Sequence, residues 1–145
     1  GMIHIFNRSH YEDVLIQRVH KWIDEKTVIQ RFAHINDFES LLTESGTTIL
    51  KFYLHISKKR QLERLQERMS DETKMWKYNE KDFEEAKLWD IYMQVYEDCF
   101  NNCFNPEWII VPADQNWYKS YLVAHTIRET LKGLHIKFPG IKKRQ

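Results

Sequence analysis

The stretch Thr48-Ile49-Leu50-Lys51-Phe52-Tyr53-Leu54-His55-Ile56 is long and nearly continuous in apolar character. Strands that helices cover on both faces have this character, whereas half-exposed strands alternate apolar and polar residues. Two shorter apolar runs, at 2–6 and 108–111, are also predicted to be strands. Because helical patterns lie between and after these runs, the sequence predicts an α/β fold with a mostly parallel sheet flanked by helices.

Helix signals occur at five places between and after the predicted strands. Ser9 begins a capping-box pattern, and Asn36, Ser57 and Asp114 are each predicted to cap a further helix. Gly46 is predicted to end the second helix. The residues predicted to face inward at helical spacing are Tyr11, Leu15, Val19, Trp22 and Ile23 in the first helix, Phe38, Leu41 and Leu42 in the second, Trp89, Tyr92, Met93, Tyr96, Phe100 and Cys103 in the fourth, and Trp117, Tyr121, Ala124, Ile127, Leu131 and Leu134 in the last.

Composition limits the class of protein. The chain has 145 residues and a mass of 17.8 kDa, which suits one compact domain. Hydrophobic residues make up 42%, enough for a buried core, while four glycines and three prolines are too few for a turn-rich all-β fold. A single domain is therefore predicted over residues 1–135, followed by a basic tail at 136–145.

Charge and cysteine content restrict the partners and the compartment. The formal net charge is +1, so no global field attracts nucleic acid. No run approaches the roughly 20 apolar residues of a membrane span. The two cysteines, Cys99 and Cys103, are too few for a disulfide framework and are predicted to be buried thiols. The sequence therefore predicts a soluble cytoplasmic protein with neither a membrane nor a nucleic acid as partner.

Basic residues are concentrated at 57–68, where five of them stand against two acids. Arg64 and Arg68 are four residues apart and are expected on one face of a helix. Two guanidinium groups on one face can form a phosphate clamp. An exposed helix with ion pairs between successive turns accounts for the same pattern, and the residue types alone leave both interpretations open.

The junction Ile5-Phe6-Asn7-Arg8-Ser9-His10-Tyr11-Glu12-Asp13-Val14 joins a predicted strand end to a predicted helix N-terminus. Ligands bind at such junctions in α/β proteins because the helix offers free amide groups and positive dipole charge. The junction resembles the second strand-end motif of the family 2 polyphosphate kinases. The resemblance continues, in order and spacing, through 49–57, 64–68, 74–77, 88–92, 96–98 and 111–118, and it spans nearly all of residues 3–134.

This resemblance implies part of a P-loop kinase fold with three α/β/α layers. It also implies transfer of phosphoryl groups between inorganic polyphosphate and nucleoside mono- or diphosphates, with Mg²⁺ as cofactor. The site residues that it implies are Asn7 and Arg8 at the catalytic centre, Arg64, Arg68, Lys74 and Lys77 in a phosphate-binding lid, and Pro112, Ala113 and Asp114 near the nucleotide base.

The roles implied for Asn7 and Arg8 are compared with what their residue types and spacing indicate. Many relatives carry Asp where this chain has Asn7, and a neutral amide is a poorer Mg²⁺ ligand than a carboxylate. No metal ligand is therefore assigned. On spacing alone, a structural role for Arg8 at the strand end is as good an interpretation as a role in phosphate binding.

The sequence departs from the family in one respect. The family's phosphate loop, a Gly-rich turn in which Gly-Lys opens a helix, does not occur among these residues, whose four glycines are Gly1, Gly46, Gly133 and Gly140. This chain alone is therefore expected to be catalytically incomplete. Two alternatives remain: a non-catalytic half-domain that binds a polyanion or a protein partner, and an enzyme similar to nucleoside monophosphate kinases.

Two features predict a homo-oligomer, most simply a twofold dimer. In folds of this type a further strand lies between those predicted at 2–6 and 48–56, so both are expected to have unpaired edges. The apolar stripe at 89–103 is wide enough to form an interface. Such a stripe is more often core within one chain, and both interpretations stay open.

Overall fold

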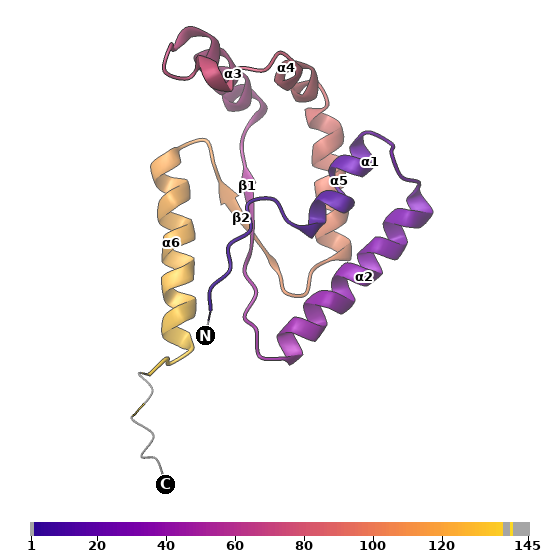
Figure 1. The fold of residues 1–145 in the computed structure, drawn as a ribbon, viewed down its shortest axis with the longest axis vertical. Coiled ribbons are helices and arrows are strands. Elements are labelled where there is room, and N and C mark those ends of the chain that lie inside the picture. The colour runs from indigo at the N-terminus through magenta and orange to yellow at the C-terminus, as the bar shows by residue number, and fades with distance from the viewer. Residues whose placement is uncertain (1, 138–139, 141–145) are drawn as a thin grey trace.

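The computed structural model describes residues 2–137 and 140, whose arrangement Figure 1 shows. In chain order the elements are the 3-10 helix η1 (His10–Asp13), α1 (Ile16–Val19), α2 (Glu25–Glu44), β1 (Lys51–His55), α3 (Lys58–Ser70), the 3-10 helix η2 (Met75–Lys77), α4 (Lys81–Ala86), α5 (Trp89–Asn102), β2 (Trp108–Pro112) and α6 (Asn116–Gly133). Among the described residues, no helix combines the length and the apolar character needed to cross a membrane. Most of the predicted tail lies outside the described residues, at 138–139 and 141–145.

The sheet consists of β1 and β2, which run parallel with Lys51 opposite Trp108 and His55 opposite Pro112. The crossover between them contains α3, η2, α4 and α5, as parallel neighbours require a long connection. Figure 1 shows α6 on one side of the two strands and α2 and α5 on the other. The predictions of an α/β fold, of a parallel sheet and of strands near 48–56 and 108–111 are thus confirmed.

The strand predicted at 2–6 is wrong. Residues 2–6 carry no strand assignment, and neither β1 nor β2 pairs with them. The side chains of Ile5 and Phe6 are 87% and 77% exposed. Strand composition favours an extended backbone, but a strand forms only where a neighbouring backbone supplies hydrogen-bond partners, and the described part of the chain places none beside this segment.

The predicted first helix is broken into two short pieces. Ser9 caps η1 by accepting a hydrogen bond from the Tyr11 amide at 3.4 Å, as the sequence predicts. The chain then leaves the 3-10 conformation and forms the four-residue α1. Tyr11, Leu15 and Val19 are buried as predicted, whereas Trp22 is exposed beyond the end of α1.

Helix α2 starts twelve residues before the predicted position, because Asp24 and not Asn36 is its N-cap. Asp24 accepts a hydrogen bond from the Thr27 amide at 2.8 Å. The buried face of α2 consists of Val28, Phe32, Ile35 and Glu39. The predicted inward positions Phe38 and Leu41 lie outside this face and are exposed. The predicted end is confirmed, since Gly46 has a φ of 85°.

The core packs η1, α1, α2 and α5 together, with Val14, Val28 and Cys99 almost fully buried. The stripe along α5 faces β1, where the Tyr53 ring centre lies 4.5 Å from that of Tyr96. The interpretation of this stripe as core within one chain is therefore confirmed. The two cysteines are buried free thiols, also as predicted.

Helix α6 is the least covered of the long helices. None of its residues is buried, and Trp117 and Tyr121 are 69% and 55% exposed, so the prediction that they face inward is wrong. The predicted cap is also wrong, because Gln115 is the N-cap of α6 and makes no side-chain capping bond. Asp114 instead bonds to the start of α3.

Candidate functional site

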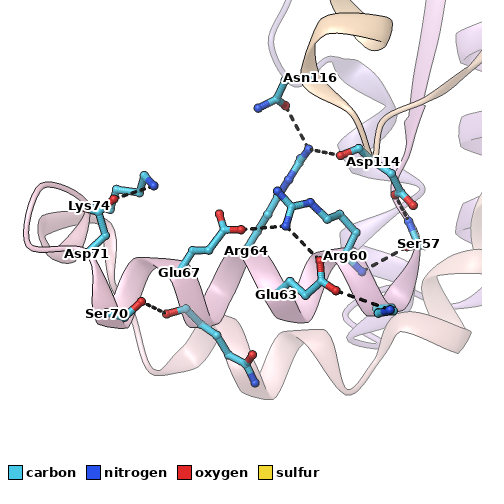
Figure 2. A network of polar contacts seen from close by, with 12 residues as sticks. Ser57, Arg60, Glu63, Arg64, Glu67, Ser70, Asp71, Lys74, Asp114 and Asn116 are labelled. Atoms are coloured by element: carbon cyan, nitrogen blue, oxygen red, sulfur yellow. Dashed lines mark hydrogen bonds and ion pairs between the residues drawn. The ribbon is translucent and has the colours of Figure 1, made fainter.

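The first turns of α3 are joined to the loop between β2 and α6 by two sets of hydrogen bonds (Figure 2). The Asp114 carboxylate accepts a bond from the Ser57 amide at 2.7 Å. The Arg64 Nη2 atom donates to the Ala113 carbonyl at 2.8 Å, to the Asp114 carbonyl at 3.2 Å and to the Asn116 side chain at 3.0 Å. We call this set of contacts the Arg64–Asp114 clasp.

The clasp depends on charge as well as on geometry. Hydrogen bonds from Ser57 hold the pKa of the Asp114 carboxyl below its usual value, and the bond from the backbone amide has the largest effect. The Arg64 cation lowers this pKa further. Asp114 therefore stays ionised at neutral pH. The clasp links one predicted lid residue, Arg64, to two residues of the predicted base region, Ala113 and Asp114.

The other predicted lid cations also have partners within the chain. The Arg68 Nη1 atom lies 2.9 Å from the Asp82 carboxylate of α4, and the Lys74 Nζ atom lies 2.7 Å from Asp71. The Lys77 ammonium lies 4.6 Å from the centre of the Trp76 ring. These side chains are partly exposed, and such pairs contribute little to stability because water and salt screen them.

The interpretation of α3 as an exposed helix with internal ion pairs is correct for its outer face. Arg60 donates to Glu63 at 3.0 Å and to Glu67 at 2.8 Å (Figure 2). The Arg60 hydrogen bond holds the pKa of the Glu67 carboxyl below its usual value. Arg64 and Arg68, by contrast, contact other elements of the chain, and their role as a phosphate clamp stays a prediction.

A cavity of about 440 Å³ lies between β1, α3, α4 and α5. Arg64 and Arg68 line it from α3, and Asp82 and Glu85 line it from the α4 side. Its aromatic wall, from β1 and α5, consists of Tyr53, Trp89, Tyr92 and Tyr96. The cavity thus combines cationic groups with aromatic faces at the end of β1 that the lid follows.

The tyrosines of this wall are held in the neutral state. Burial raises the pKa of Tyr53 to about 12. Burial first, and then a hydrogen bond to Glu85, raises the pKa of Tyr92. Neutral phenols add no negative charge to the cavity, so they do not oppose an anionic ligand.

Asn7 and Arg8 lie in the exposed segment immediately before η1. Arg8 has a φ of 68°, which an L side chain rarely adopts and which costs about 1–3 kcal/mol. No hydrogen bond or ion pair between described residues links Asn7 or Arg8 to a predicted lid cation. The structure therefore brings Arg64 to the predicted base region, while the catalytic roles of Asn7 and Arg8 stay predictions.

A buried polar cluster beneath η1 is absent from the sequence predictions. The Lys51 Nζ atom donates to Glu39 at 2.8 Å, to the Tyr11 hydroxyl at 3.0 Å and to the Cys103 carbonyl at 2.9 Å. The Tyr11 hydroxyl donates to the same Glu39 carboxylate at 2.8 Å. Glu39 and Lys51 are only 1% and 6% exposed.

The electrostatics of this cluster favour the ionised carboxylate. Burial acts to raise the pKa of Glu39, but hydrogen bonds from His10, Lys51 and Tyr11 outweigh it, so the pKa lies below its ordinary value. The single charge inside the apolar stretch 48–56 was the available signal for such a cluster. Because Tyr11 belongs to η1, the cluster fixes the element that follows Asn7 and Arg8.

The parallel β1–β2 pair flanked by helices (Figure 1) is an α/β arrangement, the fold class to which P-loop kinases belong. Among solved structures, the chain resembles polyphosphate kinase 2 from Arthrobacter aurescens TC1, with a TM-score of 0.89, 42% identity, and coverage of 97% of this chain and 50% of that chain. Residues 1–139 match the sequence family Polyphosphate kinase 2 (PPK2), and the chain belongs to this family.

Curated relatives also match almost all of this chain with about half of their own length. An AMP/ADP-polyphosphate phosphotransferase from Meiothermus ruber is 45% identical over 141 residues, which are 96% of this chain and 53% of that protein. An ADP-polyphosphate phosphotransferase from Rhodopseudomonas palustris is 36% identical over 153 residues, again 96% and 53%. The chain spans about half the length of these relatives.

Proposed function

We propose that the protein takes part in the transfer of phosphoryl groups between inorganic polyphosphate and nucleoside mono- or diphosphates. The observation that carries this proposal is the family match over residues 1–139, together with the cavity that Arg64 and Arg68 line from α3, opposite Asp82 and Glu85. Relatives named for AMP/ADP- and ADP-polyphosphate phosphotransfer support the choice of substrates.

Phosphoryl transfer depends on positioning and on charge neutralisation more than on covalent chemistry by the protein. In this proposal Arg68, Lys74 and Lys77 exchange their weak partners within the chain for phosphate oxygens. Arg64 keeps its contacts with the loop after β2 and positions the lid. In the same proposal Arg8 binds phosphate from the exposed segment before η1, and Asn7 beside it offers an amide to the same phosphates.

Magnesium is the cofactor that the family resemblance implies. Within residues 2–137 and 140, no three His, Cys, Asp or Glu side chains form a group that could hold a metal ion. The chain's own residues therefore do not fit a protein-built metal site. We propose Mg²⁺ only as an ion that accompanies the substrate phosphates, since Mg²⁺ is often held mainly by phosphates and water.

We also propose that the protein is a cytoplasmic homo-oligomer. Exposed Trp117 and Tyr121 on α6 supply residue types typical of interfaces, and the free thiols suit a reducing compartment.

The proposed function is tested by incubating the protein with polyphosphate and AMP or ADP and measuring nucleotide products. A parallel measurement follows retention on a polyphosphate resin as salt increases, since phosphate contacts weaken with ionic strength. Retention with turnover supports the proposal, and retention without turnover supports the non-catalytic half-domain. Absence of both contradicts the proposal.

A further inference from the structure

Helix α4 forms one wall of the cavity, but it is a short element. Its six residues, Lys81–Ala86, supply Asp82, Glu85 and Ala86 to the cavity lining. A helix of this length is not stable on its own in water, so its position depends on contacts with the rest of the protein. The contacts of its acidic side chains therefore decide where this wall of the cavity lies.

Two of these acidic side chains attach α4 to different parts of the protein. Asp82 lies 2.9 Å from the Arg68 guanidinium of α3. Glu85 lies 2.9 Å from the His20 Nε2 atom, and its carboxylate also accepts a hydrogen bond from the Tyr92 hydroxyl of α5. Asp82 thus connects α4 to a predicted lid residue, whereas Glu85 connects it to the end of α1 and to α5.

The His20 imidazole belongs to a segment that is itself attached to the core helices. His20 is the C-cap of α1, and its ring stacks on the Trp22 ring with centres 5.0 Å apart. Two residues earlier, Arg18 donates hydrogen bonds to Glu25 of α2 at 2.9 and 2.7 Å, and it also donates to Asp98 of α5. The imidazole therefore offers α4 a fixed point of attachment.

The proposed function requires the Arg68–Asp82 contact to break, because Arg68 exchanges Asp82 for phosphate oxygens. A helix held by Asp82 alone would follow the guanidinium, and the Asp82 carboxylate would go on competing with phosphate for it. A second attachment, made to another part of the protein, prevents this. Glu85 makes such an attachment to His20.

We propose that His20 is a positioning residue for phosphate binding, which holds α4 in place through Glu85 while Arg68 leaves Asp82 for phosphate. This inference rests on the proposed function. His20 touches no phosphate in this role and acts only through Glu85 and α4. Its effect is modest, because the His20 and Glu85 side chains are 27% and 40% exposed and water screens such contacts.

The test measures the affinity for tripolyphosphate by titration calorimetry, and amide hydrogen exchange at 81–86 without ligand. His20→Leu removes the contact with Glu85 and is expected to weaken binding about threefold and to speed exchange at 81–86. His20→Gln keeps an N–H donor for Glu85 and is expected to restore both values. His34→Leu removes an exposed histidine from α2 and is the matched control, which should change neither.

A double-mutant cycle separates positioning from a general loss of stability. Asp82→Asn removes the competing carboxylate, so adding His20→Leu to this variant is expected to leave the affinity for tripolyphosphate unchanged. A merely structural role of His20 predicts the same threefold loss with and without the Asp82 carboxylate. Equal losses in the two backgrounds would therefore overturn the inference.

The outcomes also separate this inference from the proposed function. Unchanged affinity and unchanged exchange in His20→Leu, with tripolyphosphate still bound, overturn the role of His20 and leave phosphate binding intact. Absence of tripolyphosphate binding to the unaltered protein overturns the proposed function and this inference together. Circular dichroism verifies that each variant is folded, and if His20→Leu unfolds, Glu85→Ala replaces it in the cycle with the same expected results.

Discussion

The two sides of the β1–β2 sheet differ in how completely the chain covers them. On the side of α2 and α5, the Tyr53 ring packs on α5, and Lys51 and Glu39 form a fully enclosed ion pair. On the side of α6, Leu54 points away from Tyr53 and is substantially exposed, and no residue of α6 is buried. These residues build an enclosed interior on the side of α2 and α5, whereas the side of α6 stays substantially exposed.

The largest expected effect lies on the closed side. Lys51→Met leaves the Glu39 carboxylate buried without its cation, and removing one partner of a buried ion pair costs about 3–5 kcal/mol. The free energy of unfolding from a denaturant titration should fall by this amount. The matched control is the double change Lys51→Met with Glu39→Leu, which replaces the pair by apolar groups and should recover most of the loss. Equal stability of the single variant and the unaltered protein would mean that this side is not closed as described.

The second test addresses the open side. Changing Trp117 and Tyr121 together to Ser should weaken self-association at least about 30-fold, because exposed aromatic residues often dominate interfaces. Sedimentation or light scattering over a range of concentrations measures this. The stability of the monomer should change by only about 0.5 kcal/mol, since neither side chain is buried. The control changes Trp22 and Ile29, which are exposed elsewhere, and should leave association intact; a monomeric unaltered protein would contradict the proposed oligomer.

The third test concerns the Arg68–Asp82 pair at the cavity, on the closed side. Arg68→Ala should lower the affinity for tripolyphosphate about tenfold and reduce its dependence on salt. Asp82→Asn should act in the opposite direction, because it removes the carboxylate that competes with phosphate for Arg68. Lys132→Ala, at the far end of α6, serves as the control for a lost positive charge. Weaker binding in Asp82→Asn would be inconsistent with this exchange.

The smallest expected effect is that of acidic pH on the free energy of unfolding. The pKa of Glu39 lies below its ordinary value of 4.5 in the folded protein, so ionised Glu39 stabilises the fold above that pH. The contribution should be lost progressively as the pH falls below about 4.5 and through the lower folded-state pKa. Unfolding measured at a series of acidic pH values should show this loss, and Glu39→Gln should reduce the slope. An identical slope in the variant would assign acid sensitivity to other carboxyl groups.

The sequence predicts features that depend on neighbouring residues better than contacts between residues far apart in the chain. Ser57 as the cap of α3 and the stripe of α5 depend on neighbours within a few residues, and both are confirmed. The cap at Asp114 was assigned to the adjacent helix, but its actual partner is Ser57, 57 residues away. Residues 2–6 have strand composition without a strand, because pairing depends on a separate backbone.

The candidate site divides in the same way. The positions of Arg64 and Arg68 on one helix follow from their spacing, and the structure confirms that they share α3. Their partners do not follow, because Ala113 lies 49 residues from Arg64 and Asp82 lies on another helix. The enclosed Lys51–Glu39 pair likewise joins β1 to α2. The signal for it in the sequence is the charge of Lys51 within the apolar stretch 48–56.

The Arg64–Asp114 clasp has a mechanical consequence for the lid. Helix α3 is attached to the loop after β2 at its N-cap, Ser57, and again two turns later at Arg64, so these turns are held against that loop. The helix has 13 residues and is about 20 Å long, which leaves its far end as a short lever beyond Arg64. Lys74 and Lys77 lie beyond these held turns, so we expect the backbone at 71–80 to move more freely than the turns at 60–64. Hydrogen exchange should accordingly be slow at 60–64 and fast at 71–80.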